Sequence, residues 1–406
     1  MLKRVGLFAV TAGVIAAVVA ATLGGTASAR NSKAASANVK CGSTVTIGLA
    51  YPATGPDANL GATQADWANW ARKAWNKTEK PKISFVIGDT QLGAATDLTV
   101  GVAHAFKSNS KILGVVGPPG SQEMEDSASI WKSADLAPVS GSETRVALTR
   151  AKPGTPRETT PGYFFRTVPN DGQQGDAVAT WIHSHLKFTH IYVIDDEEAY
   201  SQGLAAQVIA DLTADGVTGI GTNHISQQDT NFSSVIDAIP SNTQLVYIPW
   251  QLPSQAETFY QQLKASGKTA AIMGSDGTDL PGTFQPNGNG YVSGFPVDFS
   301  NPAVASFSKA HHGNQELFGL PSYTATMVNA TAIQAACKAG HGSTNRTAVR
   351  AAIAKVKLSK AQSLLGFPVS FLKGNHGNYQ GAGDMGGAAN FAIYKVTSSG
   401  AYQRAG

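Results

Sequence analysis

The feature that most constrains the fold of this chain of 406 residues is a strand-then-helix pattern that occurs twice. Short β-rich runs such as Thr44–Ala50 and Ile112–Val116 are followed by helical stretches such as Ala62–Asn76. After Arg145–Gly162, which is rich in Thr, Pro and Gly, the pattern begins again with the helical stretch Gly172–Leu186. Strands that alternate with helices indicate βαβ units and mainly parallel sheets. The sequence therefore predicts an α/β protein in which the same architecture appears twice.

The composition supports a globular chain with a sizeable core. Apolar residues make up 42% and charged residues only 14%, which excludes a disordered chain. The formal net charge is +4, and no Lys/Arg run or basic stripe with interleaved aromatic residues occurs. A nucleic-acid partner is therefore not expected.

The first 29 residues have the pattern of a secretory signal peptide. Lys3 and Arg4 precede the apolar stretch Val5–Leu23, and Ala27 and Ala29 form an A-x-A cleavage pattern. The alternative is an uncleaved membrane anchor, since the apolar stretch is about long enough to span a bilayer. We expect an exported, extracytoplasmic protein whose residues 30–43 form a polar leader, with Arg30–Lys40 lacking fixed structure.

Two cysteines, Cys41 and Cys337, remain in a chain expected to enter an oxidising compartment. They cannot form a metal site by themselves, and a disulfide is the natural interpretation. The alternative is a pair of buried free thiols.

Six segments carry a resemblance to a known family: IGLAYPATGP at 47–56, VVGPPGSQEMEDSASIWKSADLAPVSGSET at 115–144, YFFRTVPNDGQQGDAVATWI at 163–182, IYVIDDEEAYSQGLAAQV at 191–208, GSDGT at 274–278 and GYVSGFPV at 290–297. In order and spacing they resemble the exported substrate-binding proteins of branched-chain amino-acid-type ABC transporters, which have the type I periplasmic binding fold. The resemblance runs from Thr44 to the C-terminus.

The resemblance implies two Rossmann-like lobes with parallel sheets, joined by three hinge crossovers. Lobe 1 would comprise residues 44–150 and 300–365, and lobe 2 residues 151–299 and 366–406. The crossovers would fall near Arg145–Gly162, Val297–Pro302 and Leu364–Phe367. Ligands of open parallel sheets bind beyond the carboxyl ends of the strands, so the ligand would lie in the cleft and be trapped when the lobes close.

Three residues of lobe 1 match family positions that bind the ligand's carboxylate. Ser121 follows a strand and opens a helix, where its hydroxyl and the free N–H groups can receive an anion; a simple N-cap is the alternative. Ser142 and Thr144, in Ser-Gly-Ser-Glu-Thr, match the second carboxylate contact, with a polar turn as the alternative.

Three residues of lobe 2 complete the predicted site. Asp276 stands where the family commonly has an acidic residue facing the ligand's ammonium group, although Asp-Gly is also a common turn. Tyr200 matches an aromatic residue that packs on the ligand, and otherwise caps a helix. Trp250 follows the strand Leu245–Ile248 and is a further cleft candidate, with a packed core aromatic as the alternative.

Because the sequence departs from the family pattern, it does not determine which side chain the ligand carries. Leu60 stands where relatives often have an aromatic residue, Pro118-Pro119 replaces a more polar approach to the serine, and Asp276 is one methylene shorter than the Glu of branched-chain binders. The expected ligand is an amino acid, an amide or an aromatic acid.

The family fold also implies a Cys41–Cys337 disulfide, because it would bring the end of the helix Thr324–Gly340 beside the start of the first strand. No cofactor is expected. The acidic run Asp195–Glu198 lacks the spacing of a calcium loop, and His311-His312 with His341 lacks that of a zinc site.

These features predict a function without catalysis. No G-x-S-x-G, Walker A or G-x-G-x-x-G motif occurs, so an exported enzyme is a distant third choice. We expect a monomeric extracytoplasmic solute-binding protein that captures a small amino acid or related compound and delivers it to the permease subunits of an ABC importer. The alternative is a ligand-sensing module of the same fold that signals to a receptor or regulator.

Overall fold

The structure is a computed structural model that describes residues 37–93, 96–152, 154–296, 298, 300–311, 317–386 and 391–406. The predicted signal peptide, residues 1–29, and the leader up to residue 36 lie outside the described residues. None of the helices in the described part of the chain is long and apolar enough to cross a membrane.

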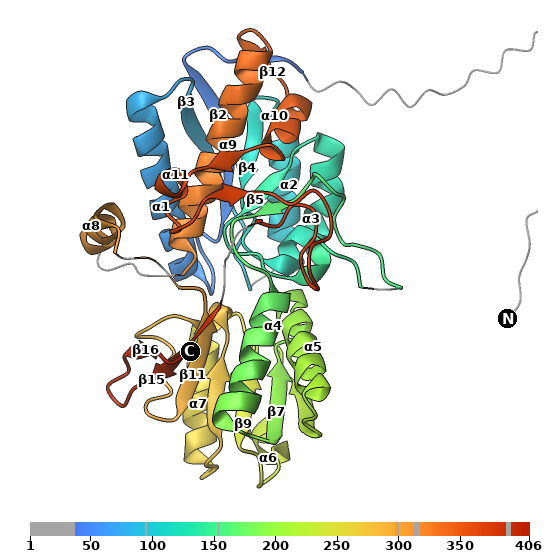
Figure 1. The fold of residues 1–406 in the computed structure, drawn as a ribbon, viewed down its shortest axis with the longest axis vertical. Coiled ribbons are helices and arrows are strands. Elements are labelled where there is room, and N and C mark those ends of the chain that lie inside the picture. The colour runs from blue at the N-terminus through green and yellow to red at the C-terminus, as the bar shows by residue number, and fades with distance from the viewer. Residues whose placement is uncertain are drawn as a thin grey trace, which may run out of the picture. The chain divides into compact units, whose positions relative to one another are not determined.

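A five-stranded parallel sheet is built from the first series of strands (Figure 1). Its order is β3 (Lys82–Asp89), β2 (Thr44–Tyr51), β4 (Ile112–Val116), β5 (Pro138–Ser140) and β6 (Phe165–Arg166). Its helices are α1 (Ala58–Thr78), α2 (Thr96–Ser108), α3 (Ser121–Ala134) and, from the C-terminal half, α9 (Gly319–Ala339), which packs against α1. All five residues of β4 are buried, as expected for a strand covered on both faces.

A seven-stranded sheet is built from the second series. Its order is β16 (Tyr402–Arg404), β15 (Ala392–Val396), β11 (Gly290–Gly294), β10 (Ala271–Gly274), β9 (Leu245–Ile248), β7 (His190–Asp195) and β8 (Gly219–His224). Strands β7 to β11 are parallel, whereas β15 and β16 from the C-terminal tail add antiparallel. Its helices are α4 (Asp171–Thr180), α5 (Ala199–Ala214), α6 (Ser233–Ala238) and α7 (Pro253–Ala265). The predicted α/β class with two mainly parallel sheets is confirmed.

The remaining elements are short or lie outside the two sheets. They are β1 (Val39–Lys40), β12 (Ser343–Thr344), β13 (Lys357–Leu358), β14 (Val369–Ser370), α8 (Pro302–Ala310), α10 (Arg346–Ile353) and α11 (Lys360–Ser363). Strand β1 pairs antiparallel with β12, so the leader, expected to lack fixed structure up to Lys40, is ordered at its end.

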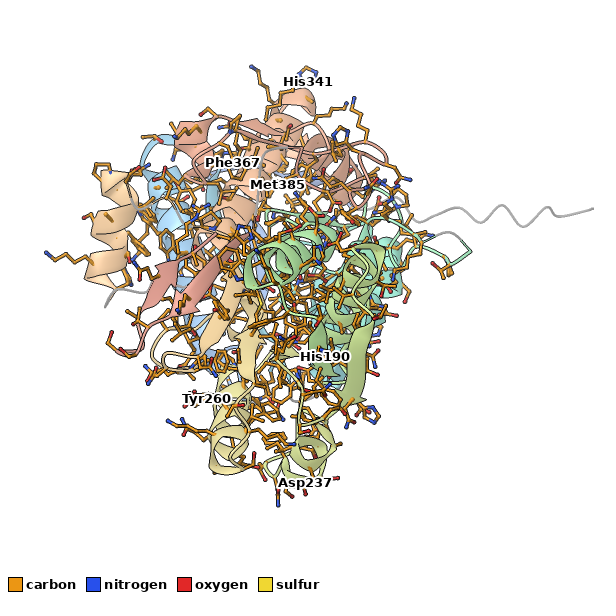
Figure 2. All side chains as sticks on the ribbon, turned by 60° about the horizontal axis from the view of Figure 1, so that its bottom comes forward. His190, Asp237, Tyr260, His341, Phe367 and Met385 are labelled. Atoms are coloured by element: carbon orange, nitrogen blue, oxygen red, sulfur yellow. A yellow bond between two sulfur atoms is a disulfide. The ribbon has the colours of Figure 1, made fainter. Side chains whose placement is uncertain are left out.

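Two segments pack with a different sheet from the one expected. Residues 151–166 were assigned to lobe 2, but they end in β6, which pairs with β5 of the five-stranded sheet. Residues 366–386 were also assigned to lobe 2, but β14 pairs with β13, and Phe371 lies in the core of the five-stranded sheet. Met385, labelled in Figure 2, lies in the same core. The cause is a buried ion pair between Arg166 Nε and Asp384 Oδ1, 2.6 Å apart, which ties the two segments together.

The chain therefore changes sheets at positions partly different from those expected. It passes to the seven-stranded sheet between β6 and α4, rather than within Arg145–Gly162. After β11 the chain contributes α9 to the five-stranded sheet, and residues up to Gly386 stay with that sheet, whereas β15 pairs with β11 of the seven-stranded sheet.

The predicted disulfide is confirmed: Cys41 and Cys337 are bonded, with their Cα atoms 5.9 Å apart. Cys41 directly follows β1 in the short connection to β2, and Cys337 lies in the last turn of α9. The backbone N–H of Cys41 also donates to the carbonyl of Gly342, 2.9 Å away. The bond therefore joins the segment before β2 to the C-terminal end of α9.

We predict that replacing both cysteines, Cys41→Ser with Cys337→Ser, lowers the free energy of unfolding by about 2 to 5 kcal/mol. The bond joins residues 296 positions apart, and cross-linking so long a loop removes much entropy from the unfolded chain. Urea unfolding of both proteins measures the difference, with a free-thiol count of the denatured, unreduced wild type as control. Equal unfolding free energies would contradict the prediction.

Candidate functional site

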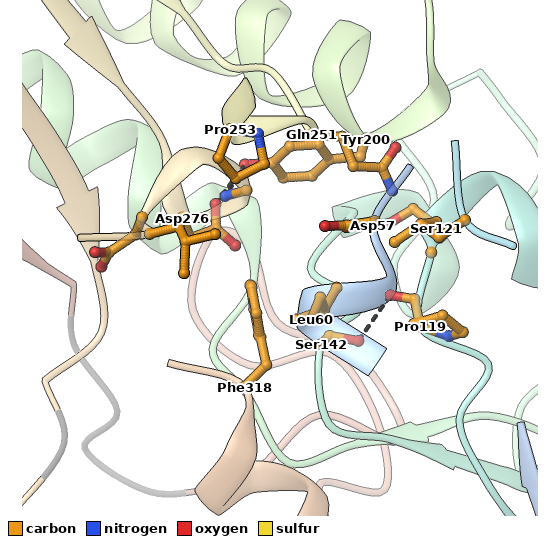
Figure 3. A pocket seen from close by; sticks show the side chains of 15 residues that line it. Asp57, Leu60, Pro119, Ser121, Ser142, Tyr200, Gln251, Pro253, Asp276 and Phe318 are labelled. Atoms are coloured by element: carbon orange, nitrogen blue, oxygen red, sulfur yellow. Dashed lines mark hydrogen bonds between the residues drawn. The ribbon is translucent and has the colours of Figure 1, made fainter. Parts of the chain in front are cut away.

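A pocket lies where loops from both sheets converge (Figure 3). Its volume is about 560 Å³, which includes space open to solvent. Its polar lining residues are Asp57, Ser121, Ser142, Tyr200, Gln251, Asp276 and Asp279. Its larger apolar lining residues are Leu60, Leu92, Pro119, Pro253, Leu280 and Phe318.

The position of the pocket follows from strand direction. Ser121 follows β4 and Ser142 follows β5 in the five-stranded sheet, whereas Gln251 follows β9 and Asp276 follows β10 in the seven-stranded sheet. The carboxyl ends of parallel strands lie at one edge of each sheet, which is where ligands of such sheets bind. The structure therefore brings four of the six predicted ligand-binding residues together: Ser121, Ser142, Tyr200 and Asp276.

Ser121 is the first residue of α3 and is almost fully buried. Its Oγ accepts a hydrogen bond from the Arg145 backbone N–H at 3.4 Å, so the hydroxyl hydrogen can be donated elsewhere. The first N–H groups of a helix have no partner within the helix and favour an anion. The Gly120 N–H is already used, because it donates to Glu123 Oε2 at 3.0 Å. An anion at this end of the pocket would therefore meet Ser121 and the first turn of α3.

Ser142 lines the pocket with a hydroxyl that is already engaged. It donates to the Pro119 carbonyl at 2.7 Å and accepts from the buried Gln64 amide at 2.9 Å (Figure 3 shows the former bond). Its backbone N–H donates to Ser140 Oγ at 3.2 Å. Ser142 thus holds the Pro119 loop in place.

Thr144 is fully buried and is not among the residues that line the pocket. The carboxyl group of Asp171 is also buried, and burial raises its pKa to about 8, with the negative charge of Asp276 adding to this rise. Thr144 therefore lies behind the wall of the pocket.

Asp276 and Tyr200 form one hydrogen-bonded unit in the opposite wall. The Tyr200 hydroxyl contacts Asp276 Oδ1 and lies 2.8 Å from Ser275 Oγ. Burial raises the pKa of Asp276 to about 6, while hydrogen bonds from Tyr200 and Gln174 oppose the rise. Asp276 is consequently ionised at neutral pH and can attract a cationic group.

Trp250 is placed in the core rather than in the pocket. Its indole N–H donates to the Ile194 carbonyl at 2.7 Å, and its ring packs against Phe232 and Phe259. It is fully buried and is not among the residues that line the pocket, so it fits the alternative interpretation of a packed core aromatic. Its carbonyl accepts a hydrogen bond from Ser275 at 3.3 Å, so it supports the loop that carries Asp276.

Several lining residues were not identified from the sequence, above all Asp57 and Gln251. Asp57 stands directly before α1, where an aspartate is an ordinary N-cap, and so gave no separate signal. Gln251 follows β9 and could have been found by the strand-end rule. Its backbone N–H donates to Asp196 Oδ2 at 3.0 Å, which fixes the loop.

The site offers no place for a metal among the residues that the structure describes, since no group of three or more His, Cys, Asp or Glu there could hold one. Of the described lining residues, none is a Lys, Arg or His. The arrangement is a solvent-accessible pocket with the N-terminus of α3 in one wall and an ionised carboxylate in the other.

Comparison with known proteins identifies the family. The family model described as periplasmic binding protein matches residues 44–400, and the chain belongs to this family. It is a family of binding proteins, so the chain is a binding protein and not an enzyme, as its sequence predicts.

The relatives include two proteins of Pseudomonas aeruginosa. The leucine-, isoleucine-, valine-, threonine-, and alanine-binding protein is 27% identical over 73% of this chain and 79% of its own length. The protein named amino acid binding protein is 25% identical over 89% of this chain and 92% of its own length.

Solved structures show the same fold. The leucine binding protein LivK of Thermotoga maritima has a TM-score of 0.75 and 20% identity, over 89% of this chain and 98% of its own. The type 1 periplasmic binding protein of Bordetella pertussis has a TM-score of 0.71 and 17% identity, over 89% and 99%. The ABC transporter substrate-binding protein of Desulfitobacterium hafniense in complex with Leu has a TM-score of 0.67 and 18% identity, over 89% and 100%. The fold is therefore that of a type I periplasmic binding protein.

We predict that Glu123→Gln makes the decline in stability between pH 5 and pH 8 less steep. Burial raises the pKa of Glu123 to about 8, so the folded protein holds a proton that the unfolded chain releases near pH 4.5. The folded state therefore loses stability as the pH rises through this window, by up to about 4 kcal/mol. Urea unfolding at both pH values measures it.

The control is Asp237→Asn, an exposed aspartate of α6 (Figure 2), whose pH dependence should match that of the wild type. A Glu123→Gln protein that declines as steeply as the wild type would contradict the prediction.

Proposed function

We propose that this chain is an extracytoplasmic solute-binding protein that captures a small amino acid or a related compound in the pocket and delivers it, as a monomer, to an ABC importer. The observation that carries the proposal is that one pocket contains a group suited to an anion and a group suited to a cation. Ser121 and the first turn of α3 form an anion seat in one wall, and ionised Asp276 stands in the other. A zwitterion carries the complementary pair of groups.

In this proposal, loops of the five-stranded sheet bind one end of the ligand and loops of the seven-stranded sheet bind the other. The ligand's carboxylate would accept hydrogen bonds from the Ser121 hydroxyl and from N–H groups of α3. Its ammonium group would donate to Asp276, which Tyr200 holds by its hydroxyl. Because one end of the ligand is bound by each sheet's loops, we propose that the sheets belong to two lobes that close on the ligand and open to release it.

Delivery to a membrane importer is supported by the relatives rather than by the pocket. The names of the relatives include amino-acid-binding proteins and ABC transporter substrate-binding proteins. We carry this role over to the present chain, with permease subunits as its partners and a location outside the cytoplasmic membrane. A thermal-shift panel of amino acids, amides and aromatic acids tests the ligand class, since a ligand at 100 times its Kd stabilises the folded state by about 2.7 kcal/mol.

For the amino acid that binds in this panel, we predict that Asp276→Asn weakens binding by about thirtyfold or more, equivalent to about 2 to 5 kcal/mol. The variant removes the charge that attracts the ammonium group but keeps a side chain of the same size. Ser121→Ala should cost less, about 1 to 3 kcal/mol, because the backbone donors of α3 remain. Titration calorimetry measures both, with thermal unfolding as the test of folding. Wild-type affinity in Asp276→Asn would contradict the assignment.

We further predict that the affinity for a zwitterionic ligand falls as the pH is lowered below about 6. The pKa of Asp276 is raised to about 6 in the free protein, so protonation below this pH removes the charge that the ammonium group needs. Binding must then release a proton, at a cost of up to tenfold in affinity per pH unit. Calorimetry between pH 4.5 and 7.5 measures the profile. An equally steep profile in Asp276→Asn would show that another group is responsible.

A further inference from the structure

Gln251 brings to the pocket a hydrogen-bond donor that the binding arrangement proposed above does not use. It follows β9 and lines the pocket, and only 9% of the residue is exposed. A Cβ atom placed on Gly277 would lie 3.1 Å from Gln251 Cα and 3.2 Å from the Tyr200 ring. Gln251 and Tyr200 therefore pack close together in the same wall of the pocket (Figure 3).

A chain of hydrogen bonds behind this wall fixes which way the Gln251 amide points. Both oxygens of buried Asp196 accept backbone N–H groups, Oδ2 that of Gln251 at 3.0 Å and Oδ1 that of Glu198 at 3.2 Å. Because Asp196 Oδ2 is an acceptor, Gln227 turns its amide nitrogen toward it, 3.0 Å away. The same nitrogen donates to Gln251 Oε1 at 3.2 Å. The Gln251 oxygen is thereby used, and its nitrogen donates to none of the residues that the structure describes.

The other side-chain donors among the described lining residues already have acceptors. The Ser142 hydroxyl donates to a backbone carbonyl, and the Tyr200 hydroxyl contacts Asp276. The Ser121 hydroxyl belongs to the proposed seat for the ligand's carboxylate. A donor that loses water without gaining a partner is costly, so a ligand that fills the pocket should bring an acceptor for Gln251. With the carboxylate and ammonium groups bound elsewhere, this acceptor belongs to the ligand's side chain.

The charges of the lining favour a neutral acceptor. Three aspartates line the pocket, and none of its described lining residues is cationic. A second carboxylate on the ligand would find no partner of opposite charge there, and burying an unpaired charge is costly. Leu60, Leu92 and Phe318 give the rest of the pocket apolar surface. An uncharged side chain with one polar end suits this lining.

We propose that the ligand is a neutral amino acid whose side chain carries a carbonyl or hydroxyl oxygen, and that Gln251 Nε2 donates a hydrogen bond to this oxygen. Gln227 is a positioning residue, because its bond to Gln251 Oε1 leaves the Gln251 nitrogen for the ligand. This assignment rests on the proposed function and names the ligand class of the same pocket.

The test compares three pairs of amino acids of similar size and shape by calorimetry at neutral pH: asparagine with leucine, threonine with valine, and glutamine with methionine. The wild-type protein should bind the polar member of at least one pair about tenfold or more tightly than its apolar partner, which leaves the Gln251 donor without an acceptor. Gln251→Met keeps the length of the side chain but removes the donor. The preference should then fall to about threefold or less.

The matched control is Gln261→Met, which removes an exposed amide from α7 and should keep the wild-type preference. Gln227→Leu should lower the preference less than Gln251→Met does, because it frees the Gln251 amide to turn but leaves it in place. A wild-type preference in Gln227→Leu would overturn the positioning role.

Apolar amino acids that bind as tightly as the polar members of all three pairs would overturn the side-chain assignment and leave the proposed function intact. An equal loss of affinity for both members of a pair in Gln251→Met would also overturn it, because Gln251 would then bind a group that all amino acids share. Failure of all six amino acids to bind would overturn the assignment, and failure of every compound in the thermal-shift panel would overturn the proposed function as well. The wild-type comparison remains decisive even if Gln251→Met does not fold.

Discussion

The buried ion pair of Arg166 and Asp384 is the interaction on which the arrangement of the site depends. Arg166 is fully buried, and its guanidinium also donates to the carbonyls of Glu143 at 3.0 Å and Arg145 at 2.9 Å. These two residues flank Thr144 in the loop that carries Ser142. Removing two charges from water is expensive, and such a pair is tolerated only when further hydrogen bonds satisfy it. Here those bonds fix one wall of the pocket.

The partners of Asp384 extend the same network to the place where the chain changes sheets. Its Oδ2 accepts from Thr149 at 2.9 Å and from Asn170 at 3.1 Å, and Asn170 caps α4. The contact with Thr149 spans 235 positions of the chain. No local pattern reveals a partner so distant. This explains why the sheet membership of residues 151–166 and 366–386 was assigned wrongly from the sequence, whereas the long strands, whose apolar runs are local, were found.

The candidate site was predictable to the extent that strand ends determine it. Ser121, Ser142, Tyr200 and Asp276 were found because each follows a recognisable strand and matches a family segment, and the structure places all four in one pocket. Trp250 also follows a strand, yet its indole N–H donates to the Ile194 carbonyl in the core. Residue type and chain position do not decide which way a large side chain turns. Asp57 was missed for the opposite reason, because an N-cap is a sufficient explanation of an aspartate there.

The acidic side chains around the pocket differ in pKa because their surroundings differ. Burial raises the pKa of Glu123 and of Asp171 to about 8, and it raises that of Glu143 well above its usual range, with the nearby Glu123 adding to the effect. Near pH 7 Glu123 and Asp171 are mostly protonated and carry little negative charge. Asp276, with a pKa of about 6, is ionised at the same pH. Different environments thus give chemically similar groups different charges near pH 7, and under the proposed function this difference leaves Asp276 as the carboxylate that meets the ligand's ammonium group.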